Sequence, residues 1–123
     1  MNIVQSMIKI QSKPVKLVMK IISIIVGILF IIIFYNIQEV LAILLAIPYF
    51  FILYIKRNDL ESVLLIVGAI LGSIGEIICV HMGVWRYTVA TTLGIPMWLP
   101  FAWGLAVYVM YGISSIIYNF IKQ

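Results

Sequence analysis

The chain has 123 residues, of which 65% are hydrophobic and 10% are charged, with 8 Lys and Arg residues against 4 Asp and Glu residues. A soluble domain carries about 25% charged residues to cover its surface, so this composition excludes a soluble enzyme, a nucleic-acid-binding domain and a disordered tail. A membrane-spanning helix needs about 20 apolar residues, and the hydrophobic residues suffice for four such helices. The sequence therefore predicts a small polytopic membrane protein.

The N-terminal 16 residues are predicted to form a short segment at the membrane interface. Ile3, Val4, Met7 and Ile8 have the spacing of an apolar stripe on one face of a helix. A helix this short is marginal alone, so we expect it to lie among the lipid headgroups. Pro14 is expected to separate it from the first membrane span.

Four membrane spans follow, predicted at residues 17–35, 37–55, 62–82 and 97–118. All four belong to a single membrane domain that covers residues 1–123. The predicted fold class is therefore all-α: a polytopic membrane protein built as a bundle of four transmembrane helices, preceded by the short N-terminal interfacial segment.

The cations predict the orientation of this bundle. Arg86 is the one cation on its side of the membrane, whereas seven lie on the other side: Lys9, Lys13, Lys16, Lys20, Lys56, Arg57 and Lys122. The positive-inside rule then places both termini in the cytoplasm. Lys20, near the start of the first span, is expected to extend its side chain outwards. The expected partner is the lipid bilayer, with a homo-oligomer left open and no nucleic acid.

The third span carries a face of small residues. At 100° per residue, a narrow arc of the helix contains Gly68, Gly72, Gly75, Cys79 and Gly83. Small residues allow a neighbouring helix to approach closely in a membrane, so we expect this face to pack against protein. Glu76 lies at the edge of the arc and is expected to point into the bundle.

Glu76 is the leading candidate for a functional residue. A charged carboxylate inside the bilayer costs about 2.5–3.5 kcal/mol, so its side chain must be protonated, paired or in contact with water. Two interpretations stay open: a proton-handling group, or a hydrogen-bonding group that holds the helices together. His81 and Cys79 do not complete a metal site with it, and no metal or cofactor is predicted.

Tyr108 is the partner predicted for Glu76. Tyr108 shares one face of the fourth span with Gly104, Tyr111 and Ser115, and this face is expected to point into the bundle. Glu76 should lie about 9 Å and Tyr108 about 12 Å below the outer boundary of the membrane. We therefore expect a hydrogen bond between them and take both as candidate catalytic residues.

Aromatic residues crowd the segment between the third and fourth spans and the start of the fourth. Tryptophan and tyrosine gather at membrane interfaces, but these could also bind a substrate. Trp103 is expected above the Glu76–Tyr108 pair, and Arg86 is expected to be the one cation able to reach it. The candidate substrate-binding residues are Trp85, Arg86, Tyr87, Trp98 and Trp103.

Residues 76–103 resemble a known family. The resemblance lies in Glu76, in Gly83-x-Trp85-x-Tyr87 and in Leu93-Gly94-Ile95-Pro96-x-x-Leu99-Pro100-x-x-Trp103. This pattern resembles carotenoid-biosynthesis membrane proteins of the hydratase and lycopene-cyclase-related type, and also small uncharacterised multi-spanning families. That family acts on isoprenoids, but the resemblance does not by itself imply this activity here, because the paired acidic motif of lycopene cyclases is absent.

Three functions are consistent with the sequence. The first is a multi-pass membrane protein of undetermined biochemical activity, whose polar residues hold the bundle together. The second is a membrane enzyme acting on an isoprenoid or other apolar lipid, with Glu76 as general acid and aromatic rings stabilising positive charge. The third is a proton-coupled transporter of a small apolar or cationic solute, with Glu76 as the proton carrier.

Overall fold

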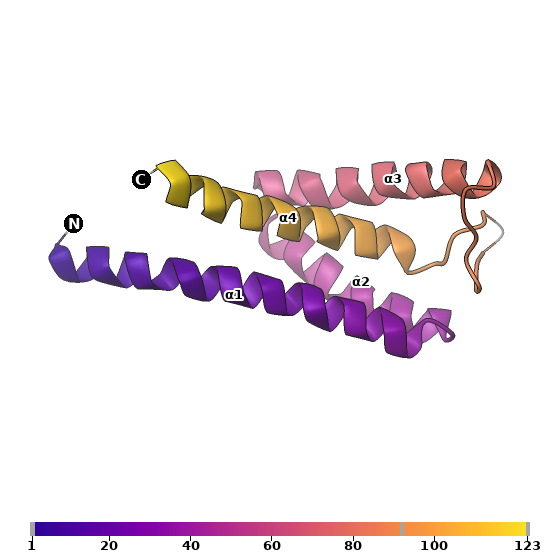
Figure 1. Ribbon diagram of the computed structural model, residues 1–123, viewed down its shortest axis with the longest axis horizontal. Helices are drawn as coiled ribbons and strands as arrows, with labels where there is room; N and C mark the ends of the chain where they lie inside the picture. Colours follow the sequence, from indigo (N-terminus) through magenta and orange to yellow (C-terminus); the bar gives the residue numbers. More distant parts are fainter. Residues whose placement is uncertain (1, 92, 123) are drawn as a thin grey trace.

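The computed structural model describes residues 2–91 and 93–122, with the side chains of residues 6–13 outside the described part. It consists of four helices: α1 (Ile3–Phe34), α2 (Gln38–Ile55), α3 (Leu60–His81) and α4 (Leu99–Lys122). Each of them is long and apolar enough to cross a membrane. Successive helices run in opposite directions, so both termini lie at the same end (Figure 1). The predicted all-α, four-helix membrane fold is confirmed.

The N-terminal segment is not separate from the first span. α1 is one continuous helix from Ile3 to Phe34, with Pro14 in its interior, so the prediction of a break at Pro14 is wrong. A proline removes one backbone hydrogen bond but still permits a helix, and membrane helices tolerate it. At 1.5 Å per residue, 32 residues reach about 48 Å, so the first turns extend beyond a hydrocarbon core of about 30 Å. The side chains of Met7 and Ile8, predicted to complete an apolar stripe, lie outside the described residues.

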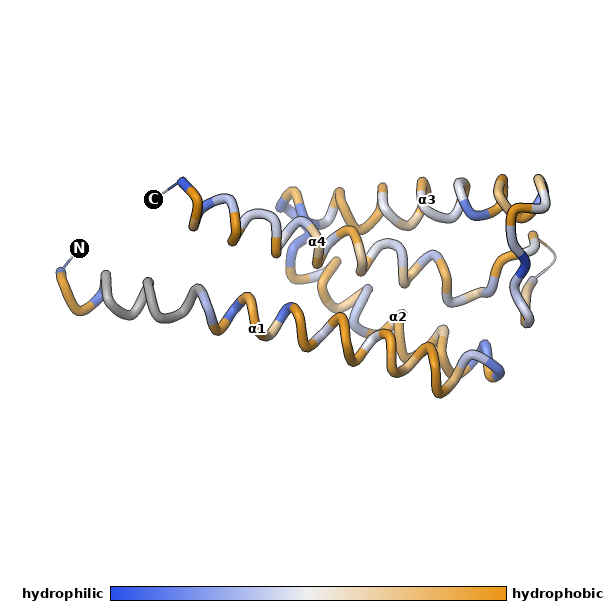
Figure 2. The backbone as a smooth tube through the Cα atoms, viewed as in Figure 1, coloured by the Kyte–Doolittle hydropathy of each residue, from blue (hydrophilic) through white to orange (hydrophobic). Residues whose placement is uncertain are grey.

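The other helix boundaries agree with the predicted spans to within four residues. Apolar residues run along every helix, and polar residues gather at the turns (Figure 2). Hydropathy locates these helices because each must keep its backbone hydrogen bonds internal while its side chains meet lipid.

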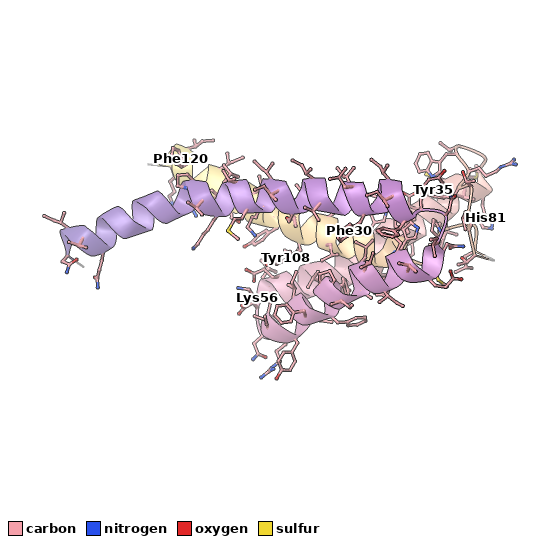
Figure 3. All side chains as sticks on the ribbon, turned by 90° about the horizontal axis from the view of Figure 1, so that it is seen from below. Phe30, Tyr35, Lys56, His81, Tyr108 and Phe120 are labelled. Atoms are coloured by element: carbon pink, nitrogen blue, oxygen red, sulfur yellow. The ribbon has the colours of Figure 1, made fainter. Side chains whose placement is uncertain are left out.

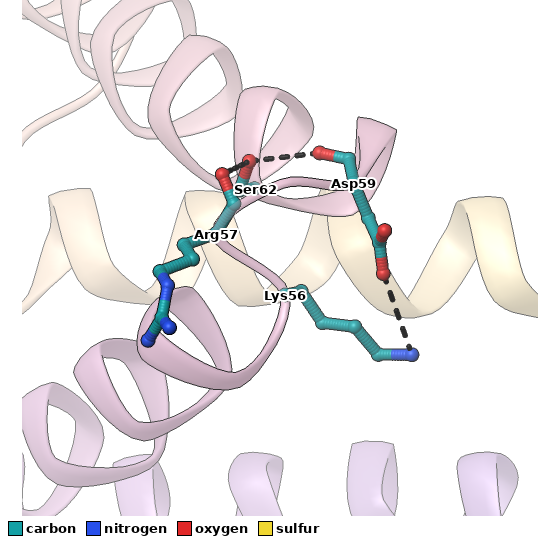
Figure 4. A network of polar contacts seen from close by, with 4 residues as sticks. All are labelled: Lys56, Arg57, Asp59 and Ser62. Atoms are coloured by element: carbon teal, nitrogen blue, oxygen red, sulfur yellow. Dashed lines mark hydrogen bonds and ion pairs between the residues drawn. The ribbon is translucent and has the colours of Figure 1, made fainter.

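The turn between α2 and α3 is closed by local polar contacts (Figure 4). Ser62 Oγ donates to the carbonyl oxygens of Asp59 at 2.8 Å and Arg57 at 3.3 Å. Lys56 Nζ lies 4.0 Å from Asp59 Oδ2. These contacts satisfy polar groups at the start of α3 and make α2 and α3 antiparallel neighbours.

α4 is the central helix of the bundle. It packs against each of the other three, most extensively against α3, whereas α1 packs only against α2 and α4 among the described residues. At the junction of α2, α3 and α4, Tyr49 Oη donates to the carbonyl oxygen of Leu65 at 3.0 Å. Gly104 leaves room for this contact, because a Cβ there would meet the Tyr49 ring and come within 2.6 Å of the Leu65 oxygen.

The glycine face of α3 contacts α4 along part of its length. A Cβ at Gly68 would lie 2.9 Å from Val107, and one at Gly72 would collide with the Trp103 ring. Gly75 and Gly83 have no such neighbour within 4 Å. The predicted close approach is therefore confirmed for Gly68 and Gly72 and wrong for Gly75 and Gly83. Gly75 lies about 60° around the helix from Gly72, and Gly83 lies beyond the end of α3 at His81.

Candidate functional site

Glu76 is surrounded by three aromatic hydrogen-bond donors. Its Oε2 accepts from Tyr87 Oη at 2.7 Å and from Trp85 Nε1 at 2.9 Å. Its Oε1 accepts from Trp103 Nε1 at 3.3 Å. An indole nitrogen can only donate, so both carboxylate oxygens act as acceptors. This cluster of Glu76, Trp85, Tyr87 and Trp103 is called the Glu76 cluster below.

Gly72 positions Trp103 within the Glu76 cluster. Residues four apart lie one above the other on a helix face, so Gly72 and Glu76 present one continuous strip of α3 to α4. The indole ring of Trp103 occupies the space that a side chain at position 72 would fill. Its Nε1 is thereby held at the level of the Glu76 carboxylate.

The C-terminus of α3 brings Trp85 and Tyr87 back over Glu76. Val84 N donates to the Cys79 carbonyl at 2.9 Å and Gly83 N to the Val80 carbonyl at 3.1 Å, which is the Schellman pattern. Gly83 has φ +78°, a left-handed conformation that glycine adopts without steric cost. The chain reverses there, and the next residues fold back along α3.

The electrostatics of the cluster come from hydrogen bonds rather than from an ion pair. Burial, followed by the hydrogen bond and the charge of Glu76, raises the pKa of Tyr87 above its usual range. No cation in the described part of the chain lies within ion-pair distance of Glu76, so the prediction that Arg86 reaches it is not met. Arg86 is exposed and instead lines a small pocket of about 240 Å³ with Tyr35, Tyr87 and Thr88.

The predicted hydrogen bond between Glu76 and Tyr108 is wrong. The ring of Tyr108 lies beneath Lys20 of α1, whose Nζ is 5.1 Å from the ring centroid. Figure 3 shows Tyr108 toward the middle of the bundle, away from His81 at the end of α3. Trp103 is the α4 partner of Glu76 instead. Trp103 and Tyr108 are five residues apart, which turns their side chains about 140° from one another on α4. Trp103 therefore faces α3, and Tyr108 faces α1.

The predicted substrate-binding residues form two groups that share Tyr87. Arg86, Tyr87 and Trp98 line the small pocket of about 240 Å³. Trp85, Tyr87 and Trp103 meet at Glu76, and the expected closeness of Trp103 to Glu76 is confirmed. Trp98 is buried, with 7% of its surface exposed, in a core that also contains Leu41, Leu45, Ile95 and Leu99. The role of these residues in substrate binding stays a prediction.

A second candidate site, absent from the sequence analysis, is a cavity of about 590 Å³ between α1, α2 and α4. Its walls are almost entirely apolar, and the polar side chains that reach it are Lys20, Ser23 and Tyr108. Lys20 packs against α4 rather than extending freely outwards, so that prediction is wrong. A cavity arises from how three helices fit together, which a hydropathy pattern does not encode. The small residues Gly27, Ala102 and Ala106 on its walls are the signal of it in the sequence.

Comparisons with protein-family models, with curated proteins and with solved structures found no match to this chain. The resemblance of residues 76–103 to carotenoid-biosynthesis proteins therefore stays a prediction.

Proposed function

We propose that this multi-pass membrane protein binds the hydrocarbon chain of an apolar lipid or amphiphile in the cavity between α1, α2 and α4. The observation that carries the proposal is the cavity itself. Its volume of about 590 Å³ falls within the range of about 300–1,000 Å³ that is typical of ligand pockets, which are also predominantly apolar. An isoprenoid is the class of lipid that the resemblance of residues 76–103 suggests.

The α1 wall of the cavity contains Val26 and Ile28, which are 40% and 51% exposed. A hydrocarbon chain could therefore enter sideways from the bilayer without crossing the polar ends of the helices. α1, which forms this wall, has the smallest buried fraction of the four spans.

The Glu76 cluster supports an anchoring role for Glu76 rather than a role as general acid or proton carrier. All three partners donate to the carboxylate, so its oxygens are already engaged as acceptors. The hydrogen bonds connect α3, α4 and the segment between them. A rigid α3–α4 pair would then form the fixed side of the bundle, against which α1 and α2 enclose the cavity.

Replacing Gly27 by phenylalanine is expected to abolish binding. Gly27 lines the cavity, and a Cβ there meets nothing within 4 Å, so the phenyl ring can enter the space without displacing a helix. The measurement uses purified protein in phosphatidylcholine nanodiscs and a long-chain alcohol carrying a photoreactive diazirine near its chain end. Wild-type adducts, mapped by mass spectrometry, are expected on cavity residues such as Ile31 and Leu105.

The matched control is Ile32→Phe, which adds a ring to the same helix at a position that is 60% exposed and outside the cavity. This variant is expected to label like the wild type. Adducts spread over the lipid-facing residues of all four helices in the wild-type protein would contradict the proposal. So would equal labelling of cavity residues in the Gly27→Phe and Ile32→Phe variants.

We also propose that both termini and the α2–α3 turn face the cytoplasm, with residues 83–98 on the opposite side. The seven-to-one distribution of cations supports this orientation. In a Cys79→Ser background, cysteines introduced at Asn58 and Gln123 are expected to react with an impermeant maleimide only after the membrane is opened. A cysteine at Thr91 should react in intact cells. The reverse pattern of labelling would overturn the orientation.

A further inference from the structure

We propose that the cavity selects a single-chain lipid with an anionic carboxylate head, such as a free fatty acid, and that Lys20 binds this head. The inference rests on the proposed function and deepens it, because it specifies which end of the ligand lies where. It is carried by the position of one ammonium group at the end of an otherwise apolar cavity.

Lys20 is held by α4 in a defined position. Its Nζ lies 5.1 Å from the centroid of the Tyr108 ring, a cation–π contact. Gly112 makes room for the rest of the side chain, since a Cβ there would lie 2.6 Å from both Cε and Nζ. The ring and the glycine occupy one turn of α4, and together they hold the ammonium group at the wall of the cavity.

The ammonium group has no anionic partner in the protein. No Asp or Glu of the described chain lies within ion-pair distance of Lys20. Lys20 is 14 residues before the end of α1, about 21 Å along the helix, so its Cα is about 9 Å inside the opposite boundary of a 30 Å core. A charge at this depth is costly unless it is paired. A tyrosine ring compensates it only in part, and an anion supplied by a ligand would complete the pair.

The shape of the cavity fits one extended chain. From Lys20 to Ile31 the cavity follows α1 for about 16 Å at 1.5 Å per residue. The opposite end is lined by apolar side chains, including those of Ile31, Leu45 and Ala102. A head at Lys20 therefore directs the hydrocarbon toward the end of the bundle that carries the Glu76 cluster.

The depth of Lys20 favours a carboxylate over a phospholipid. In a bilayer the phosphate of a phospholipid lies outside the hydrocarbon core. Its glycerol and two chains would have to enter the cavity for the phosphate to reach Lys20. A carboxylate attached directly to one chain is small enough to reach the ammonium group while the chain alone fills the cavity.

The test compares three photoreactive probes that share one diazirine-bearing chain and differ in the head: carboxylate, alcohol or trimethylammonium. They are added to wild-type protein in phosphatidylcholine nanodiscs at alkaline pH, where the carboxylate is ionised. The carboxylate probe is expected to label the cavity about tenfold more efficiently than the alcohol, given the strength of hydrogen bonds between charged groups. The trimethylammonium probe should label least. The adducts should lie near Ile31 and Ala102, far from Lys20.

Lys20→Met is expected to remove the preference for the carboxylate while leaving the alcohol unaffected, and Lys20→Arg is expected to keep it. Lys16→Met is the matched control, because it removes an exposed cation one turn away on the same helix.

Equal labelling by carboxylate and alcohol in the wild type, or an unchanged preference in Lys20→Met, would overturn the role of Lys20 but not the cavity. Competition by unlabelled phosphatidylglycerol that exceeds competition by an unlabelled fatty acid would overturn the single-chain ligand. Absence of cavity labelling by every probe would refute the proposed function itself.

Discussion

Replacing Gly72 by alanine is expected to lower the free energy of unfolding by about 1–3 kcal/mol, the usual cost of overpacking a well-filled interior. The added Cβ would collide with Cγ and Cδ2 of the Trp103 ring and with the Trp103 Cβ, which is bonded to the α4 backbone. These atoms cannot rotate away as the end of a flexible side chain can, so α4 must shift. The shift also withdraws Trp103 Nε1 from Glu76. Titration with denaturing detergent, followed by circular dichroism, measures the loss.

Gly75→Ala is the matched control for Gly72→Ala. Gly75 is three residues along the same helix, and a Cβ there has open space around it. Alanine has the higher helix propensity by about 1 kcal/mol, so this variant should be neutral or slightly stabilising. Equal destabilisation by the two substitutions would show that α4 does not approach α3 at Gly72. The larger Gly72→Leu substitution should prevent the bundle from folding.

Replacing Glu76 by leucine is expected to destabilise the protein by at least about 2 kcal/mol, because hydrogen bonds to charged groups contribute about 1.5–3 kcal/mol each. Three donors lose their acceptor at once. Trp85 is 45% exposed and can turn to water, whereas Tyr87 and Trp103 are half-buried and lose more. The segment after Gly83 should also lose its attachment to α3. Amide hydrogen exchange in residues 84–89 should therefore become much faster in this variant.

Glu76→Gln keeps the shape of the side chain but replaces the carboxylate by an amide. The amide keeps one acceptor oxygen but turns an NH₂ group toward a donor, so we expect an intermediate loss of stability. Glu61→Leu is the control, since it removes a carboxylate from the same helix that makes no hydrogen bond or ion pair in the described residues. Unchanged hydrogen exchange in Glu76→Leu would contradict an anchoring role for Glu76.

The number and alternating direction of the helices, and the bounds of α2, α3 and α4 to within four residues, could be predicted from the sequence, whereas the start of α1 could not. In a membrane the backbone must satisfy its hydrogen bonds within each helix, so a local apolar run specifies an element without reference to the rest of the chain. The same reasoning identified Glu76 as the polar residue that needs partners, and Gly68 and Gly72 as points of close approach. All of these follow from the cost of exposing a group to lipid, which depends on the residue and its position along one helix.

Which side chains meet across helices depends on how the whole bundle packs. The depths of Glu76 and Tyr108 matched closely enough to suggest a bond, but the rotation of α4 about its axis directs Trp103 to α3 and Tyr108 to α1. Helix rotation depends on packing against all neighbours at once, which no single helix pattern specifies. The return of the chain at Gly83 brought Trp85 and Tyr87 to Glu76 in the same way. The cavity at Lys20 is likewise a property of three helices together, because it is the space that their side chains leave unfilled.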